Sequence, residues 1–339
     1  MKKLVVWVVA TLAAAFVSTA SADPLPVDKR IVLLVDEWKA VRNLPVVVAE
    51  RLGYLKSDGM DVTVMNVRDD VWHGDMLMDG RIDAVMAYWH HNVVNHSIGR
   101  DTQAIVTLGV TPGAKVLVGN HAKDKVRTLA DLKGSRFIAG GAGSSKTTVA
   151  NALVLAGGLK LNDYTRLGTD GKELNVVALR EGKADFIVAP TPDGGFYESQ
   201  GVATVFADLT TLEGTKKAFG VPFPSSTVFM ATARVKERPE IARHLAKAFT
   251  RALHYMNTHS ADEIAALVPK EVVGKDREKY MKAMKEALPM FANDGRMPAD
   301  GAAFEFRTLA EFDPKFKSVQ VERTYTNAFV DEALKGLLQ

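Results

Sequence analysis

The chain has 339 residues, with 43 Lys and Arg, 40 Asp and Glu and no cysteine. This near balance of charge excludes a strongly basic nucleic-acid-binding protein, and the lack of cysteine excludes both disulfide bonds and a lipid anchor carried on cysteine. The length exceeds what one hydrophobic core usually serves, so we expect two domains.

The first 22 residues have the pattern of a secretory signal peptide. Lys2 and Lys3 precede an apolar stretch at 4–17, and Ala20 and Ala22 are the small residues expected before a cleavage site. A membrane anchor is the other interpretation, but about fourteen apolar residues are too few to span roughly 30 Å of hydrocarbon. We expect cleavage after residue 22, which leaves 41 basic and 40 acidic residues.

The next part of the chain predicts strands alternating with helices. Strands are expected at 30–35, 61–67 and 81–87, because these segments are short apolar runs that are β-branched or alternating. Helices are expected at 46–55 and 74–79. This β-α-β-α-β order predicts a parallel sheet with helices on both faces.

The same order returns further along the chain, which predicts a second lobe of similar structure. The expected strands are 136–139, 163–167 and 184–189, and the expected helices are 128–133, 146–157 and 174–182. Each set also contains a Gly-x-x-Asp turn before an apolar strand, at Gly80 to Asp83 and at Gly182 to Asp185. We interpret the pair as two α/β lobes.

Two apolar, extended segments, 115–119 and 227–232, are the expected hinge strands between the lobes. From residue 239 onward the pattern is helical, and Ile241, Leu245 and Phe249 recur at the four-residue spacing of one helix face. We expect this tail to pack on the first lobe.

The predicted fold class is therefore α/β: a two-lobed clamshell in which each lobe is a mostly parallel sheet flanked by helices. The expected division of the chain is a signal peptide at 1–22, a first lobe made of 23–115 and 229–339, and a second lobe at 116–228.

Four short motifs then point to a known family. They are the segment AERLGYLKSDGMDV at 49–62, DGRIDA at 79–84, TLADLKG at 128–134 and GKAD at 182–185. In this order and spacing the chain is similar to periplasmic binding proteins for nitrate, alkanesulfonates, taurine and thiamine-pyrimidine precursors, over residues 30–260. The resemblance implies a protein that closes on a small-molecule ligand and docks on an ABC permease in the inner membrane.

The first predicted lobe carries polar and aromatic residues after each strand. Ligands of open parallel sheets bind beyond the carboxyl ends of the strands, so these residues are candidates for the site. Tryptophans at equivalent strand ends predict an aromatic wall for a planar ligand, and the alternative is that they pack in the core. The candidates chosen in this lobe are Trp38, Asp69, Tyr88, Trp89 and His90, with Trp72 as a weaker one.

The second lobe offers a glycine-rich loop that opens a helix. Glycines let the backbone approach a ligand, and a capped helix N-terminus favours sulfonate, carboxylate or phosphate oxygens. The alternative is a capped loop that binds nothing. The candidates there are Gly143, Ser144, Ser145, Lys146 and Thr147, and Thr191 and Asp193 are expected on the opposite edge, unless they only form a turn.

Two other kinds of chemistry are set aside. Residues 140–147 fit the nucleotide-binding P-loop pattern except at Ser145, where that pattern requires glycine. His90, His91 and His96 have no HExxH motif or cysteines beside them, so a metal site is not expected. A hydrogen bond from His90 or His91 to the ligand is expected instead.

The sequence thus predicts ligand binding without catalysis, with no cofactor and no nucleic-acid partner. A freely soluble exported protein of this type needs an outer membrane to retain it, so we expect a monomer in a Gram-negative periplasm. The expected ligand is a small organic solute with a planar body and an acidic or polar end. The alternatives are an exported ligand-sensing protein and an enzyme of the same fold; the relatives that synthesise the thiamine pyrimidine use a cysteine motif, which is absent here.

Overall fold

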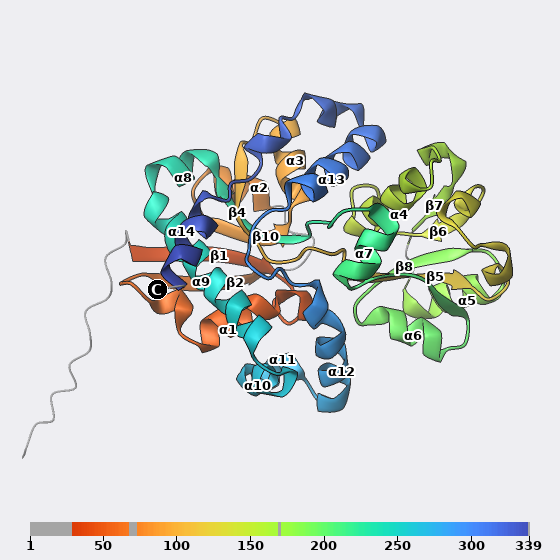
Figure 1. Cartoon of the computed structure of the whole chain (residues 1–339), viewed down its shortest axis with the longest axis horizontal. Helices are drawn as coiled ribbons and strands as arrows, with labels where there is room; N and C mark the ends of the chain where they lie inside the picture. Colours follow the sequence, from red (N-terminus) through yellow and green to blue (C-terminus); the bar gives the residue numbers. More distant parts are fainter. Residues whose placement is uncertain (1–28, 68–72, 169–170, 338–339) are drawn as a thin grey trace, which may run out of the picture.

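The computed structural model describes residues 29–67, 73–168 and 171–337. Two five-stranded sheets form two lobes that lie side by side (Figure 1). The expected signal peptide and the candidates Asp69 and Trp72 lie outside the described residues. No helix in the described ranges has the length and apolar character needed to cross a membrane.

The first lobe is built on a sheet with the strand order β2-β1-β3-β10-β4. β1 runs parallel to β2 and β3, whereas β10 lies antiparallel between β3 and β4. Both faces are covered, because Leu33 and Val35 of β1 pack into one hydrophobic cluster and Leu34 into another. The strands are β1 (Arg30–Asp36), β2 (Asp61–Val67), β3 (Ala84–Tyr88), β4 (Thr102–Thr107) and β10 (Ser226–Ala231).

The second lobe repeats this arrangement with the order β7-β6-β8-β5-β9. β6 runs parallel to β7 and β8, and β5 lies antiparallel between β8 and β9. In each sheet one strand, β10 or β5, runs against the other four, so the sheets are mixed and mostly parallel, as predicted. The strands are β5 (Ala114–Gly119), β6 (Arg136–Ile138), β7 (Thr165–Leu167), β8 (Phe186–Pro190) and β9 (Ala203–Leu209).

Helices flank both sheets, and the predicted apolar face of the long helix α9 is confirmed: Ile241, Leu245 and Phe249 are fully buried. The helices of the first half of the chain are α1 (Leu44–Arg51), α2 (His73–Met78), α3 (His90–Ser97), α4 (Ser145–Ala156), α5 (Lys172–Arg180), α6 (Asp193–Ser199) and α7 (Leu212–Phe219). Those of the remainder are α8 (Thr232–Glu237), α9 (Pro239–Thr258), α10 (Ala261–Leu267), α11 (Lys270–Val273), α12 (Arg277–Ala287), α13 (Ala299–Phe312) and α14 (Ala328–Leu337).

The two Gly-x-x-Asp turns have the same structural role in both lobes, which is to hydrogen-bond to a neighbouring strand. Gly80 and Gly182 have positive φ angles of 74° and 66°, which glycine adopts without strain. The aspartates that follow then accept a backbone hydrogen bond from the neighbouring strand: Asp83 from the N–H of Val32 at 2.9 Å, and Asp185 from that of Arg136 at 2.8 Å. Each turn thereby fixes the register of the next parallel strand.

The hinge prediction needs a correction. The segments 115–119 and 227–232 do form strands, but β5 and β10 lie inside the second and the first sheet respectively. The chain crosses between lobes at 108–113 and at 220–225 instead. These crossings pair with each other, because Phe223 N–H donates to Val110 O at 3.0 Å and Ser225 N–H donates to Gly109 O at 2.9 Å.

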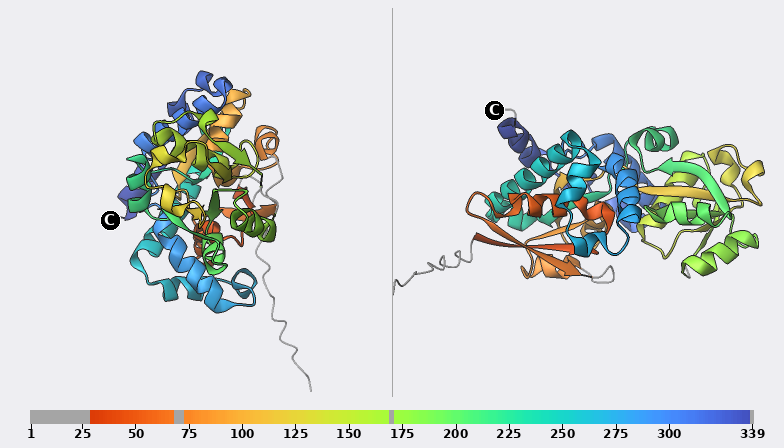
Figure 2. Two further views of the ribbon diagram at one scale, coloured as in Figure 1. Left: turned by 90° about the vertical axis from the view of Figure 1, so that its right-hand side faces the viewer. Right: turned by 90° about the horizontal axis from the view of Figure 1, so that it is seen from below.

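The tail also contacts more than the first lobe. α13 packs against α4 of the second lobe as well as against α3 (Figure 1). Its Phe304 ring lies 5.1 Å from that of Phe219 on α7, measured between ring centroids. In the view from below, blue helices of the tail lie at the junction of the lobes, whereas the darkest blue helix, next to the C-terminus, lies at the far end of the first lobe (Figure 2).

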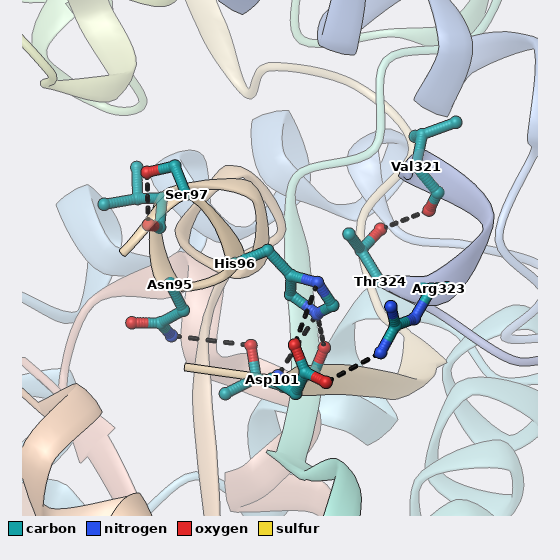
Figure 3. A network of polar contacts seen from close by, with 9 residues as sticks. Asn95, His96, Ser97, Asp101, Val321, Arg323 and Thr324 are labelled. Atoms are coloured by element: carbon teal, nitrogen blue, oxygen red, sulfur yellow. Dashed lines mark hydrogen bonds and ion pairs between the residues drawn. The ribbon is translucent and has the colours of Figure 1, made fainter. Parts of the chain in front are cut away.

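The carboxyl end of α3 is tied down by a polar network (Figure 3). The His96 ring nitrogen Nε2 lies 2.7 Å from the carbonyl oxygen of Thr102, and Asp101 forms an ion pair with Arg323 at 2.7 Å. Thr324 donates to Val321 O at 2.6 Å. This network joins α3 to β4 and to the tail, and it thereby fixes where the opposite end of α3 points.

Candidate ligand-binding cleft

A cleft of about 1020 Å³ lies between the lobes, at the carboxyl ends of β1, β3, β6 and β8. Such a volume suits a small organic ligand. The first lobe contributes Asp36, Glu37, Lys39, Ala40, Val41, Arg42, Tyr88, His90 and His91. The second lobe contributes Gly140, Gly141, Gly143, Ser144, Ser145, Lys146, Pro190, Thr191, Pro192 and Asp193, and the first crossing contributes Gly113.

The loop after β1 forms one wall of the cleft. The guanidinium of Arg42 lies 3.5 Å from Asp36 and 3.0 Å from Glu37. Burial disfavours the charge of Arg42, but Tyr88 and these two carboxylates outweigh it and raise the pKa of Arg42. Arg42 therefore keeps its positive charge, and the carboxylates of Asp36 and Glu37 are paired with it.

Trp38 lies in the same loop but does not line the cleft. Its side chain is half-buried against the first-lobe core, and its backbone N–H donates to Oδ1 of Asn66 on β2 at 3.0 Å. Residues on either side of it, Glu37 and Lys39, reach the cleft. The backbone turn here sends the indole toward the core instead, which corrects the prediction for Trp38.

Of the three candidates after β3, which are Tyr88, Trp89 and His90, Trp89 does not reach the cleft. Tyr88, His90 and His91 line the cleft, but Trp89 is completely buried in the cluster between β3, α3 and α13. The chain enters α3 at once, so consecutive residues point to different sides. Trp89 is thus a core residue, and His90 and His91 lie on the first turn of a helix rather than on a strand end.

The glycine-rich loop of the second lobe forms part of the cleft wall, and its contact with a ligand stays a prediction. Ser144 caps α4: its Oγ accepts from Thr147 N–H at 3.3 Å and donates to Ala139 O at 3.0 Å. Gly140 and Gly143 have φ angles of 77° and 82°, which allow the tight turn before the helix. Ser145 and Lys146 then follow at the start of α4, facing the cleft.

Thr147 does not line the cleft, and its side chain supports the loop. It is 1% exposed, and its hydroxyl oxygen lies within hydrogen-bonding distance of two carbonyl acceptors, Ala139 O at 3.0 Å and Gly141 O at 2.8 Å. These bonds hold the loop in shape. Across the cleft, Thr191 and Asp193 occupy the predicted edge, and Asp193 forms an ion pair with Lys172.

The tail supplies a wall that the sequence did not predict. Residues of α11, α12 and the turns around them line the cleft: Val273, Lys275, Asp276, Lys279, Tyr280, Ala283, Ala287 and Met290. Burial raises the pKa of Tyr280 to about 12, so its hydroxyl keeps its proton. These helices carry an ordinary amphipathic pattern, so no local signal marks them as part of a site.

The charges of the cleft favour an anion. Its acids are engaged: Asp36 and Glu37 with Arg42, Asp193 with Lys172, and Asp276 as the N-cap of α12. Among the described residues no ion pair is formed by the lining lysines, which are Lys39, Lys146, Lys275 and Lys279. The same part of the chain holds no group of three His, Asp or Glu placed to bind a metal ion.

Comparisons with known proteins agree with this architecture. Residues 41–262 match the family model described as NMT1/THI5 like. A solved structure from Bordetella bronchiseptica RB50 is 27% identical, with a TM-score of 0.72 over 92% of this chain and 98% of that one. A search of curated protein sequences found no match.

Two further solved structures share the fold. One is a putative periplasmic sulfonate-binding protein of an ABC transporter, SsuA from Methylobacillus flagellatus KT, at 14% identity and a TM-score of 0.69, covering 91% of this chain and 95% of that one. The other is the desulfurization enzyme DSZB, at 13% identity and a TM-score of 0.62, covering 91% and 99%. The fold therefore serves both binding proteins and an enzyme.

Proposed function

This chain belongs to the NMT1/THI5-like family, and we propose that it is a periplasmic solute-binding protein that captures a small organic anion for an ABC importer. The observation that carries the proposal is the cleft between the lobes, which is lined by the start of α4 and by lysines from three parts of the chain that form no ion pair with another described residue. A helix N-terminus and nearby cations both stabilise negative charge.

The ligand class follows from the two kinds of wall. Lys146 and the capped start of α4 suit the oxygens of a sulfonate or carboxylate. The rings of Tyr88, His90 and His91 gather on the other wall, with centroids 5.9 Å apart for Tyr88 and His90 and 4.4 Å for His90 and His91. These rings replace the tryptophans as the surface for a planar ligand body. Aromatic or alkane sulfonates, carboxylates and pyrimidine thiamine precursors fit this description.

The proposed mechanism is lobe closure around the ligand. The ligand binds to one lobe and then completes its contacts with the other, which shifts the population toward the closed form that a permease recognises. The paired crossings at 108–113 and 220–225 are the segments that would bend. The lobe boundaries near 115 and 228, the signal peptide, the monomeric state and export to the periplasm remain predictions that accompany this proposal.

Catalysis is the competing proposal, because an enzyme shares the fold. The cleft hydroxyl of Ser144 is committed to the loop backbone, where it donates to Ala139 O. A serine nucleophile is activated by a hydrogen bond to a general base, whereas the hydrogen bonds of Ser144 shape the loop before α4, so binding without chemistry is the better-supported function.

The test is a thermal-shift screen of residues 23–339 against sulfonates, nitrate, aromatic carboxylates, pyrimidines and flavins. A ligand at a hundred times its Kd should stabilise the protein by about 2.7 kcal/mol, which raises the Tm by several degrees. We expect hits among the sulfonates or carboxylates. A folded protein that responds to none of the anions, with no ligand already bound by mass spectrometry of the denatured sample, would exclude the proposal.

A matched pair of variants ties such hits to the cleft. Lys146→Gln removes a cation at the start of α4 and should weaken binding of the anion by about tenfold, because a charge-assisted contact contributes about 1.5–3 kcal/mol. Lys160→Gln makes the same chemical change in the same lobe, outside the cleft. Equal affinity in both variants would place the ligand elsewhere.

A further inference from the structure

A buried acid lies directly behind the cleft wall. Glu305 on α13 is 1% exposed, and among the described residues neither of its carboxyl oxygens has a hydrogen-bond partner. Its Oε1 lies 3.8 Å from Nδ1 of His90, just beyond hydrogen-bonding distance. Within the described ranges this is its one contact at ion-pair distance with a basic side chain.

The surroundings of Glu305 keep it neutral. On the same face of α13, Ala302 and Leu309 pack with Trp89 in an apolar cluster. An ionised carboxylate without partners is very unfavourable in such a place. Burial accordingly raises the pKa of Glu305 well above its usual value. The acid therefore holds a proton next to the ring of His90.

His90 connects this acid with the cleft. It is 3% exposed and still contributes to the cleft wall, while its Nδ1 faces Glu305. Tyr88 on β3 and His91 on α3 also face it, with ring centroids 5.9 Å and 4.4 Å from that of His90. An anion bound against this wall stabilises a positive imidazolium over a neutral ring. The proton needed for that charge is already stored on Glu305.

We propose that Glu305 is a positioning residue that supplies His90 with its proton when an anion binds. The O–H bond of Glu305 breaks and an N–H bond forms at Nδ1 of His90. A neutral acid and a neutral ring become a carboxylate and an imidazolium, so the pair keeps a net charge of zero. The inference rests on the proposed binding of an anion in the cleft.

This arrangement has a measurable consequence for pH dependence. Because the pair carries one proton before and after binding, the wild-type protein takes no proton from solvent when the anion binds. In Glu305→Gln the amide has no proton to give, so a charged His90 must take one from solvent. Affinity then falls about tenfold per pH unit above neutrality, as expected for the uptake of one proton.

The first arm of the test needs no ligand. Infrared difference spectra of ligand-free wild type and Glu305→Gln at pH 7 should differ by the C=O stretch of a protonated, buried carboxyl group. Glu311→Gln makes the same change at an exposed position of α13 and should leave that band intact. If the wild type lacks the band, Glu305 is ionised and the proposal is overturned.

The second arm adds butanesulfonate as the probe. In wild type and Glu311→Gln its addition should convert the carboxyl band into a carboxylate band, and its affinity should change less than about twofold between pH 6 and pH 8. Glu305→Gln should show the steep pH dependence described above. An unchanged carboxyl band on binding, or the same pH profile in all three proteins, overturns the proton transfer.

The two proposals fail in distinguishable ways. If butanesulfonate and the other anions of the screen bind none of the three folded proteins, the proposed anion-binding function fails, and the proton transfer that depends on it fails as well. If the anion binds the wild type and the carboxyl band persists, the function stands and only the role of Glu305 is overturned.

Discussion

Lys115 on β5 of the second lobe forms an ion pair with Glu286 on α12 of the first lobe, with Nζ and Oε1 3.0 Å apart. The two side chains are 16% and 28% exposed, and Glu198 lies 3.4 Å from the same Nζ. Burial disfavours the charge of Lys115, but Glu286 and Glu198 outweigh it and raise the pKa of Lys115. The ion pair links the lobes beside the cleft.

Breaking this link should favour lobe opening. Glu286→Gln keeps the shape of the side chain but removes its charge, and a partly buried pair contributes about 1 kcal/mol. We expect ligand affinity to fall about fivefold and small-angle X-ray scattering to give a larger radius of gyration. Glu278→Gln, at an exposed position of α12, is the control. Identical scattering and affinity in both variants would show that the pair does not hold the lobes together.

Trp89 should matter for stability and not for ligand binding, because it is fully buried between β3, α3 and α13. Trp89→Ala should lower the free energy of unfolding by about 3–5 kcal/mol. Trp89→Phe keeps most of the packing and should remain folded, with ligand affinity within about twofold of wild type. Urea unfolding and calorimetric titration measure both. If Trp89→Phe binds the ligand more weakly at unchanged stability, Trp89 takes part in ligand binding and this prediction is wrong.

The ionised carboxylate of Asp185 should stabilise the folded protein at neutral pH, and this stabilisation should be lost in strong acid. Burial would raise its pKa, but Arg136 and His121 outweigh burial and lower the pKa of Asp185 from 3.8 to about 2. Since the folded-state pKa is the lower one, the contribution is fully present above pH 3.8 and is lost as the pH falls to about 2.

The variant for this prediction is Asp185→Asn. It should lower the free energy of unfolding by about 1 kcal/mol at pH 7, after allowance for screening by solvent, and by less at pH 3. Urea titrations at both pH values measure the free energy of unfolding of each protein. Asp124→Asn, at an exposed position, is the control. A deficit that does not shrink on acidification would mean that the charge of Asp185 is not its source.

Gly301 on α13 should resist substitution although it lies in a helix. A Cβ at this position would lie 2.5 Å from the carbonyl oxygen of Pro222, in the second crossing. Gly301→Ala should therefore destabilise the protein by about 1–3 kcal/mol. Gly336→Ala on α14 meets no atom within 4 Å and should be neutral or stabilising by up to about 1 kcal/mol. Thermal unfolding of the two variants compares them, and equal Tm values would mean that α13 can move away from the crossing.

Local patterns in the sequence were sufficient to predict much of the fold. The alternating strands and helices of both lobes follow from apolar periodicity, which depends only on neighbouring residues. The Gly-x-x-Asp turns are equally local, since a positive φ at Gly80 or Gly182 and an aspartate three residues later define them. The loop before α4 was predicted for the same reason: glycines and the capping Ser144 specify it by themselves.

Tertiary structure decided which side chains reach the cleft. Trp89 and His90 are adjacent in sequence, yet one is in the core and the other is on the cleft wall, because α3 begins at that point and α13 covers one side of it. Lys279 and Tyr280 reach the cleft from a helix about 190 residues further along the chain. Glu305 meets His90 for the same reason. Contacts between such distant segments depend on how the lobes and the tail pack, and no local periodicity encodes that packing.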